Sequence, residues 1–180
     1  MQKIFLLCAL FLLCCWQPVH AEPTTVYHNP TYGFSVALPT SFTDLASKSE
    51  ANLVAKANKN ITVQILQFKP QTYSGSTFGT LKPEEIKAFM QRQGIVTSIK
   101  TPNFKFFNSD TNVTATKFPY FWMMFIAGTQ AKGEVVTTTL LKNYFLNKDK
   151  LIEIDFIMSG NGGQADIDTV NHIIDSFKFD

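Results

Sequence analysis

The segment from Phe118 to Ala127 constrains the fold of this chain more than any other part of the sequence. It reads Phe-Pro-Tyr-Phe-Trp-Met-Met-Phe-Ile-Ala and carries no charged residue. In an extended strand, successive side chains point to opposite faces of the sheet, so this segment is apolar on both sides. A strand of that kind has to be covered on both faces. Phe118, Tyr120, Trp122, Met124 and Ile126 are expected to face one way, and Phe121, Met123, Phe125 and Ala127 the other.

Two stretches elsewhere in the chain have the spacing of amphipathic helices that would supply this cover. Pro83 suits a first helical position and Gly94 is a common terminator, so the first helix is expected at about 83–94. The second helix is expected at about 165–176. Apolar residues three or four apart form one stripe on each helix: Ile86, Phe89 and Met90 on the first, and Ile167, Val170, Ile173, Ile174 and Phe177 on the second.

Most of the remaining chain is expected to form strands. A hairpin turn at 147–150 would place Lys142 opposite Asp155 and Leu141 opposite Phe156, which are chemically consistent pairs. The pattern as a whole predicts the α+β class, with an antiparallel sheet flanked by helices on both faces in an α/β/α sandwich. The expected strands are 24–27, 34–38, 52–57, 61–68, 95–107, 113–127, 134–146 and 151–158.

The first 21 residues have the pattern of a secretory signal peptide. Lys3 precedes an unbroken apolar run over residues 4–16, and Val19 and Ala21 are small residues at the −3 and −1 positions of a cleavage site. The apolar run is shorter than the ~20 residues that a membrane-spanning helix needs. We therefore expect cleavage after Ala21, a periplasmic or secreted protein with no stable membrane insertion, and a single domain over residues 22–180.

Cysteine usage and charge narrow the classes of function. Cys8, Cys14 and Cys15 all fall within the predicted leader, so the mature chain would have no disulfide and no thiolate metal site. The 16 Lys+Arg nearly balance the 14 Asp+Glu, so the chain lacks the basic footprint of a nucleic-acid-binding protein. We expect no nucleic-acid partner, no metal and no cofactor, and the sequence shows no catalytic constellation.

Both ends of the predicted domain resemble the PsbP/DcrB-like superfamily. Near the start, Tyr32 to Ser35 reads Y-G-F-S and Leu38 to Phe42 reads L-P-x-x-F, and near the end Ile174 to Phe179 reads I-x-S-F-x-F. The resemblance implies an antiparallel sheet sandwiched by helices. It implies no active site, because the superfamily has no shared catalytic residues and its members mostly bind or stabilise partners. The leader favours a bacterial secreted branch over the photosynthetic one.

Two groups of polar residues have spacings that suit chemistry. Glu153 and Asp155 share one face of a predicted strand, as the paired carboxylates of a glycosidase would. We interpret them as surface charges on a half-exposed strand. Asp168, His172 and Asp175 lie on one side of the second predicted helix, where they could hold a metal ion. The solvated face of an amphipathic helix explains that pattern equally well.

An aromatic and apolar group is the candidate ligand or partner surface, and it comprises Phe104, Phe106, Tyr120, Trp122 and Met124. Packed together, these side chains are core, and partly open they form an apolar groove or partner patch. The first hypothesis is a non-enzymatic protein that binds a protein partner in the cell envelope or outside the cell. The alternative is a carrier of a small apolar ligand in a groove near Trp122, and a hydrolase ranks third.

Overall fold

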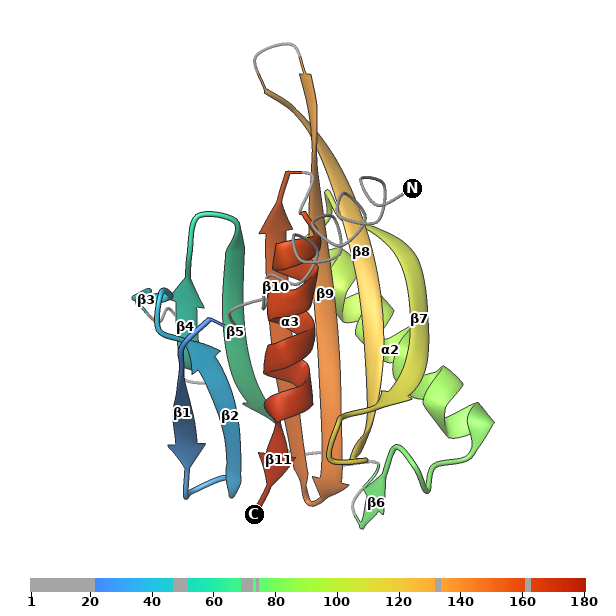
Figure 1. Ribbon diagram of the computed structural model, residues 1–180. Helices are drawn as coiled ribbons and strands as arrows, with labels where there is room; N and C mark the ends of the chain where they lie inside the picture. The colour runs from blue at the N-terminus through green and yellow to red at the C-terminus, as the bar shows by residue number, and fades with distance from the viewer. Residues whose placement is uncertain (1–21, 47–51, 69–72, 74, 132–133, 161–162) are drawn as a thin grey trace, which may run out of the picture.

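The computed structural model describes residues 22–46, 52–68, 73, 75–131, 134–160 and 163–180. The predicted signal peptide lies outside these residues. The described chain forms two antiparallel sheets and two helices (Figure 1), and this confirms the predicted α+β class. No helix among the described residues is long and apolar enough to cross a membrane.

The larger sheet has eight strands and holds most of the core. Its order is β3-β4-β5-β10-β9-β8-β7, and β6 pairs with β9 beside this path. Neighbouring strands pair antiparallel. The strand order places the long strands β10, β9 and β8 in the interior of the sheet. The bounds are β3 Thr43–Asp44, β4 Asn52–Ala57, β5 Ile61–Phe68, β6 Ser76–Thr77, β7 Lys105–Val113, β8 Pro119–Ala131, β9 Glu134–Lys148 and β10 Lys150–Ser159.

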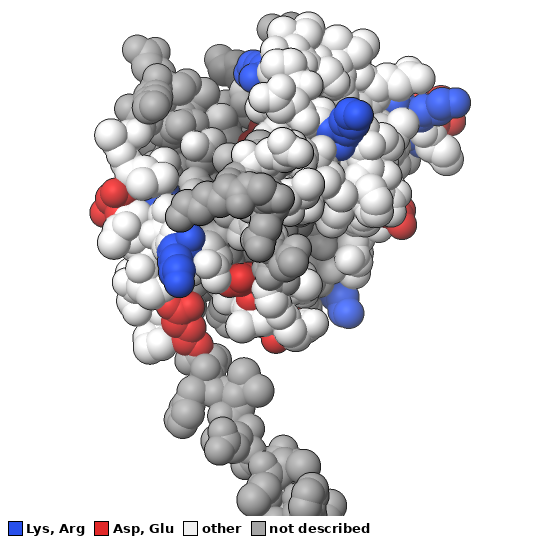
Figure 2. Space-filling view, turned by 90° about the horizontal axis from the view of Figure 1, so that it is seen from above, with Lys and Arg blue, Asp and Glu red and all other residues white. Residues whose placement is uncertain are grey.

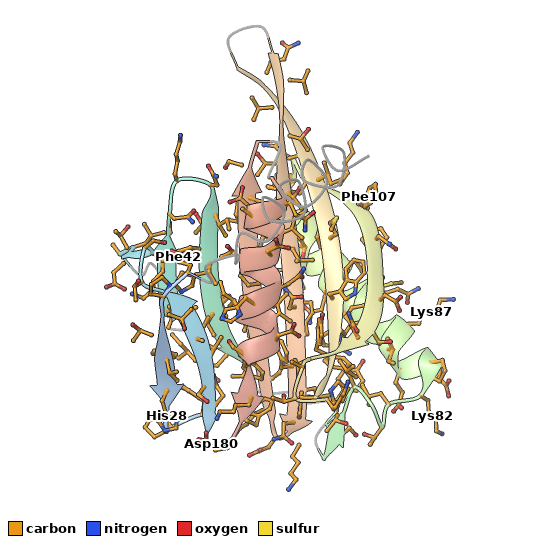
Figure 3. All side chains as sticks on the ribbon, in the orientation of Figure 1. His28, Phe42, Lys82, Lys87, Phe107 and Asp180 are labelled. Atoms are coloured by element: carbon orange, nitrogen blue, oxygen red, sulfur yellow. The ribbon has the colours of Figure 1, made fainter. Side chains whose placement is uncertain are left out.

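The smaller sheet brings the two ends of the domain together. Its order is β1-β2-β11, with β1 at Thr24–Asn29, β2 at Phe34–Pro39 and β11 at Lys178–Phe179. The chain reaches β11 directly from α3, Gln164–Ser176. His28 and Asp180 lie at the same end of the molecule, with 3.8 Å between Nδ1 of the histidine and a carboxylate oxygen of the aspartate (Figure 3).

The predicted pairing of the last two long strands is confirmed. Lys142 lies opposite Asp155, Leu141 opposite Phe156 and Leu146 opposite Leu151. The turn is tighter than expected because Lys148 adopts a left-handed conformation with φ of 56°, and the strands are paired up to Asn147 and Lys150. The strands expected at 52–57 and 61–68 are β4 and β5, and they pair as a hairpin with a register shift between Asn52 and Val54.

The first predicted helix is longer than its sequence signals indicated. The helix α2 spans Pro83–Lys100, so Gly94 does not end it. The strand expected at 95–107 was wrong over 95–100, and only its last residues, 105–107, lie in a strand, β7. A glycine inside a helix costs about 1 kcal/mol relative to alanine, which surrounding packing readily offsets. At the start of α2, the Lys82 backbone N–H donates to the Glu85 carboxylate at 2.8 Å, as in a capping box.

The strand predicted over 113–127 is also corrected. Strand β7 ends at Val113 and β8 begins at Pro119. Between them the chain turns, and Lys117 takes the left-handed φ of 64° there. Within the sheet, β8 pairs with β7 along one edge and with β9 along the other.

Side chains of β8 alternate between two separate core clusters. Tyr120 belongs to the cluster that contains Val170, Ile173 and Ile174 of α3. Its neighbour Phe121 belongs to the second cluster, together with other residues of β8, β9 and α2. In Figure 1, α3 lies in front of β10 and β9, and α2 lies behind the sheet near β9 and β8.

Candidate functional site

A cavity of about 440 Å³ lies between α2 and the sheet, and we call it the α2 cavity. This volume falls in the range of about 300–1,000 Å³ that is usual for small-molecule sites. Its walls come from α2, β5, β9 and β10 and from the chain just after α2. Its lining residues are Gln64, Leu66, Phe68, Tyr73, Phe89, Arg92, Gln93, Val96, Thr97, Lys100, Thr101, Phe104, Leu140, Lys142, Leu151, Glu153, Asp155 and Ile157.

The composition of α2 explains why space remains beneath it. In its first half Phe89 is buried, and its ring contacts four aromatic rings at centroid distances of 5.1 to 5.8 Å. One and two turns further along the same side, the helix carries Gln93 and Thr97 instead of large apolar residues. Meanwhile Ile95 and Ile99 are 63% and 75% exposed. In the second half of α2, Val96 is the apolar residue that lines the cavity, and it is 37% exposed, so the space above the sheet is left unfilled.

Three charged side chains on the sheet form one wall of the α2 cavity, and we call them the charged cluster. Lys142 Nζ donates to a carboxylate oxygen of Glu153 and to one of Asp155, at 2.6 Å in both cases. Glu153 and Asp155 are two apart on β10 and therefore share a face, while Lys142 lies opposite Asp155 on β9. All three side chains are about nine-tenths buried.

Burial and mutual charge shift the pKa values of the charged cluster. Burial raises the pKa of Asp155 well above its usual value, and the negative charge of Glu153 raises it further. Burial alone would lower the pKa of Lys142, but the carboxylates of Asp155 and Glu153 outweigh that effect and leave it raised. Lys142 therefore stays protonated, while burial favours the neutral form of Asp155.

Three buried polar atoms in this region have no hydrogen-bond partner among the described residues. They are Oδ1 of Asp155, Oγ1 of Thr97 and the hydroxyl oxygen of Tyr144. Asp155 and Thr97 line the α2 cavity, and Tyr144 lies opposite Glu153 in the sheet. Burial raises the pKa of Tyr144 well above its usual value, and the charges of Glu153 and Asp155 add to this. Buried polar atoms normally have partners, so atoms of this kind beside a cavity indicate a place for a ligand or for water.

The earlier interpretation of Glu153 and Asp155 as surface charges was wrong. Their strand lies in the interior of the sheet, between β5 and β9, and α2 passes over the same face. Both residues are less than 10% exposed. The alternation of apolar and acidic residues in β10 resembles that of a half-exposed strand. The acidic face of β10 is buried because β5 and β9 lie on either side of the strand and α2 lies over it.

The five residues predicted as a ligand or partner surface do not form one site. Tyr120 is buried in the cluster on the α3 side, and Trp122 packs against that cluster. Phe104 lines the α2 cavity on the other side of the sheet. Phe106 is about half exposed, and its ring lies 5.8 Å from that of Phe125. Met124 is half-buried on the same strand as Trp122.

The polar face of α3 remains a surface feature. Asp168, His172 and Asp175 are all exposed. Asp168 accepts a hydrogen bond from Gln164, and Asp175 accepts one from the backbone N–H of Ala115. Across the described residues, no group of three or more His, Cys, Asp or Glu side chains is arranged to hold a metal ion.

Charged side chains on the face seen in Figure 2 are dispersed. In the view from above, lysine and arginine side chains alternate with acidic ones on a surface that is mostly uncharged (Figure 2). Arg92 and Lys100 are the remaining charged residues that line the α2 cavity, and both are exposed. The charged cluster is therefore set apart from the rest of the surface by its burial.

Comparison with known proteins identifies the fold. No family model and no curated protein matches the sequence. Among solved structures, cyanobacterial PsbP (CyanoP) from Synechocystis sp. PCC 6803 is similar over 91% of this chain and 96% of its own, with a TM-score of 0.63 and 12% identity. A mutant of the protein Mog1 is similar over 88% of this chain and 96% of its own, with a TM-score of 0.50 and 9% identity. The Ran-binding protein Mog1p of Saccharomyces cerevisiae is similar over 88% of this chain and 96% of its own, with a TM-score of 0.49 and 8% identity.

These similarities confirm the resemblance that the end motifs predicted. The chain has a PsbP/Mog1-like fold, and the match extends over nearly the whole of this chain and of the solved structures. At identities of 12% and 9%, the likeness defines the fold and carries no functional residue across. Function therefore has to be argued from the α2 cavity and the surface of this chain.

Proposed function

We propose that the protein is a non-enzymatic binding protein that acts in the periplasm or after secretion and takes a small molecule into the α2 cavity. The leader-like sequence supports export, and the similarity to PsbP and Mog1 supports a binding type of fold. In this proposal the architecture is the predicted sandwich, with α3 covering one face of the large sheet and α2 covering the other incompletely.

The α2 cavity is the observation that carries this proposal. A site for a small molecule needs concave apolar walls and a few converging polar groups. Leu66, Leu140 and Leu151 supply apolar wall, while Asp155 supplies a buried oxygen without a partner. The groove predicted near Trp122 is replaced by this cavity on the opposite face of the sheet, so the ligand hypothesis is kept and its location is changed.

A neutral fluorescent probe, N-phenyl-1-naphthylamine, tests whether the α2 cavity accepts an apolar guest. Its fluorescence is expected to rise when it is titrated with the protein. The variant Val96→Trp places a large ring at a lining position and should abolish the rise. Ile99→Trp is the matched control because Ile99 lies one turn away on α2, does not line the cavity and is 75% exposed. Equal responses of both variants, or no response of the unaltered protein, would contradict the proposal.

A protein partner is the second candidate function, and exposed apolar side chains on β7 favour it. Phe107 is 64% exposed and lies at the outer side of the sheet (Figure 3), while Phe106 is 52% exposed and Val113 47% exposed on the same strand. Exposed apolar side chains gathered on one element are a common feature of interaction surfaces.

The edge of β7 is not open to simple strand addition. Asn108, Asp110 and Asn112 each accept a hydrogen bond from the backbone N–H of the following residue, at 2.7 to 2.9 Å. Alternate N–H groups of this edge strand are thereby satisfied without another strand, which protects the edge. A partner would therefore contact the side chains of Phe106 and Phe107 and not the backbone.

Photo-crosslinking distinguishes this second candidate. A photoreactive phenylalanine analogue at position 107 should give a discrete crosslinked protein in cell-envelope preparations, and the same analogue at exposed Thr43, on the opposite edge of the sheet, should not. Identical patterns at the two positions would argue against a partner surface on β7.

A further inference from the structure

We propose that the α2 cavity selects small molecules that carry a protonated amine on an apolar body. This inference rests on the proposed function, because it names the class of ligand for the same cavity. It is drawn from the charge, the hydrogen bonding and the apolar walls of the site.

The charge of the cluster favours a cationic head group. Glu153 and Asp155 share the single ammonium of Lys142, at 2.6 Å from Nζ to each carboxylate. When both acids are ionised, the cluster keeps one negative charge that Lys142 does not neutralise. A buried charge is stable only when it is paired and hydrogen-bonded. A ligand ammonium would supply the missing positive charge.

The hydrogen-bonding capacity of the cluster points to the same class. An ionised carboxylate only accepts hydrogen bonds, and Oδ1 of Asp155 receives none from the described residues. An ammonium group offers three donors, so it can bond this oxygen and still reach a second acceptor. A carboxylate or phosphate head would add negative charge and acceptors to a wall that already has too many of both.

The remaining lining residues fix the orientation of such a ligand. Apolar side chains surround the polar wall, among them Phe89, Phe104 and Ile157, so the body of the ligand would contact these. Arg92 and Lys100 of α2 also line the cavity, and both are exposed. Solvent screens exposed charges far more than buried ones, so the ammonium is drawn to the charged cluster and away from these two cations.

The groups that face Asp155 predict how binding depends on pH. They are Lys142 and Tyr144 from β9 and Glu153 from β10, and Arg92 and Lys100 of α2 line the same cavity. The amine needs Asp155 in its ionised form, and burial raises the pKa of that carboxyl. Amine binding should therefore strengthen as the pH rises above the acid range, until the amine itself loses its proton.

Three matched compounds test the class of ligand by displacement of N-phenyl-1-naphthylamine from the full mature protein. 2-Phenylethylamine is a cation, 2-phenylethanol is neutral and 3-phenylpropanoate is an anion, and all three carry the same 2-phenylethyl body. We expect the amine to displace the probe at a concentration about tenfold or more below that of the alcohol, which is the ratio that one hydrogen bond to a charged group provides. The anion should be the weakest.

Two variants assign the preference to the charged cluster. Asp155→Asn keeps the shape but removes the charge, and it should reduce the preference for amine over alcohol to about threefold or less while the probe still binds. Glu153→Gln serves as a second variant should Asp155→Asn fail to fold. Asp168→Asn, on the exposed face of α3, is the control and should leave the preference unchanged.

The outcomes separate this inference from the function on which it rests. Probe binding with equal displacement by all three compounds, or with preference for the anion, would overturn the amine class and leave the cavity as a ligand site. If the probe does not bind, and the folded variants Val96→Trp and Ile99→Trp behave alike, both the amine class and the proposed function would be overturned.

Discussion

The side of the large sheet that packs against α3 is more completely filled than the side that lines the α2 cavity. On the α3 side, Phe177 stacks against Phe145 with a centroid distance of 4.0 Å and is fully buried, as are Phe145 and Phe34. On the α2 side, Phe89 fills the first part of the interface, and beyond it lie a cavity and three charged groups. The first face stabilises the fold, and the second keeps polar groups and space that stability alone would not favour.

The largest expected effect compares the anchoring aromatic residue of each face. Phe177→Ala should lower the free energy of unfolding by about 5 kcal/mol, because a fully enclosed site cannot collapse around the missing ring. Phe89→Ala should cost about 3 kcal/mol, because the neighbouring cavity lets its surroundings relax. Urea denaturation of the two variants measures this difference. A larger loss for Phe89→Ala would mean that the α2 face is as tightly packed as the α3 face.

The second effect separates buried from exposed ion pairs. Lys142→Met leaves two buried carboxylates without their cation and should destabilise the protein by about 3 kcal/mol or more. Lys56→Met breaks the pair with Asp44, whose side chain is 84% exposed, and should cost about 1 kcal/mol or less. Thermal unfolding at neutral pH gives both values. Similar values for the two variants would show that the charged cluster is hydrated like a surface pair.

The third effect is a dependence of stability on pH that arises from Asp155. A carboxyl whose pKa is raised in the folded state holds its proton more tightly there than in the unfolded chain. The resulting stabilisation is present at low pH and is lost as the pH rises from 3.8 toward the raised value. Asp155→Asn should remove this loss, so its stability relative to the unaltered protein should improve as the pH increases. A constant difference across that range would contradict the raised pKa.

The smallest expected effect uses one substitution on both helices. Thr97→Val removes a buried hydroxyl that has no partner and should stabilise the protein by about 1 kcal/mol. Thr169→Val removes a hydroxyl that donates to the carbonyl of Ala165 at 2.8 Å, so it should destabilise by about 0.5–1 kcal/mol. Differential scanning calorimetry resolves the two signs. The same sign at both positions would show that Thr97 has a partner in solution.

Much of the fold could be predicted because its signals are local. The period-two pattern and turn residues specified the pairing of β9 with β10, and the apolar stripe specified α3. The end of α2 was missed because Gly94 resembles a terminator, while the helix actually ends at a cap on Thr101. Ile167, predicted as part of the buried stripe of α3, is 44% exposed because it lies in the first turn of the helix.

The candidate site could not be predicted because it depends on which strands become neighbours. Glu153 and Asp155 were noticed as a pair, but their burial requires β5 beside β10 and α2 above it. The aromatic residues around Trp122 led to the prediction of a groove there, although β8 places the Trp122 side chain on the α3 side of the sheet. The useful signal was the polar character of Gln93 and Thr97 on the side of α2 that continues from Phe89.

Methyl-resolved NMR during titration with 2-phenylethylamine tests the contrast between the two faces most directly. The expected result is that methyl resonances of Leu66, Leu140 and Leu151, which line the α2 cavity, shift together with one saturating curve. Those of Ile154 and Ile173, buried on the α3 side, should stay in place. Shifts confined to the α3 side, or no shifts on either side at saturating amine, would contradict the account.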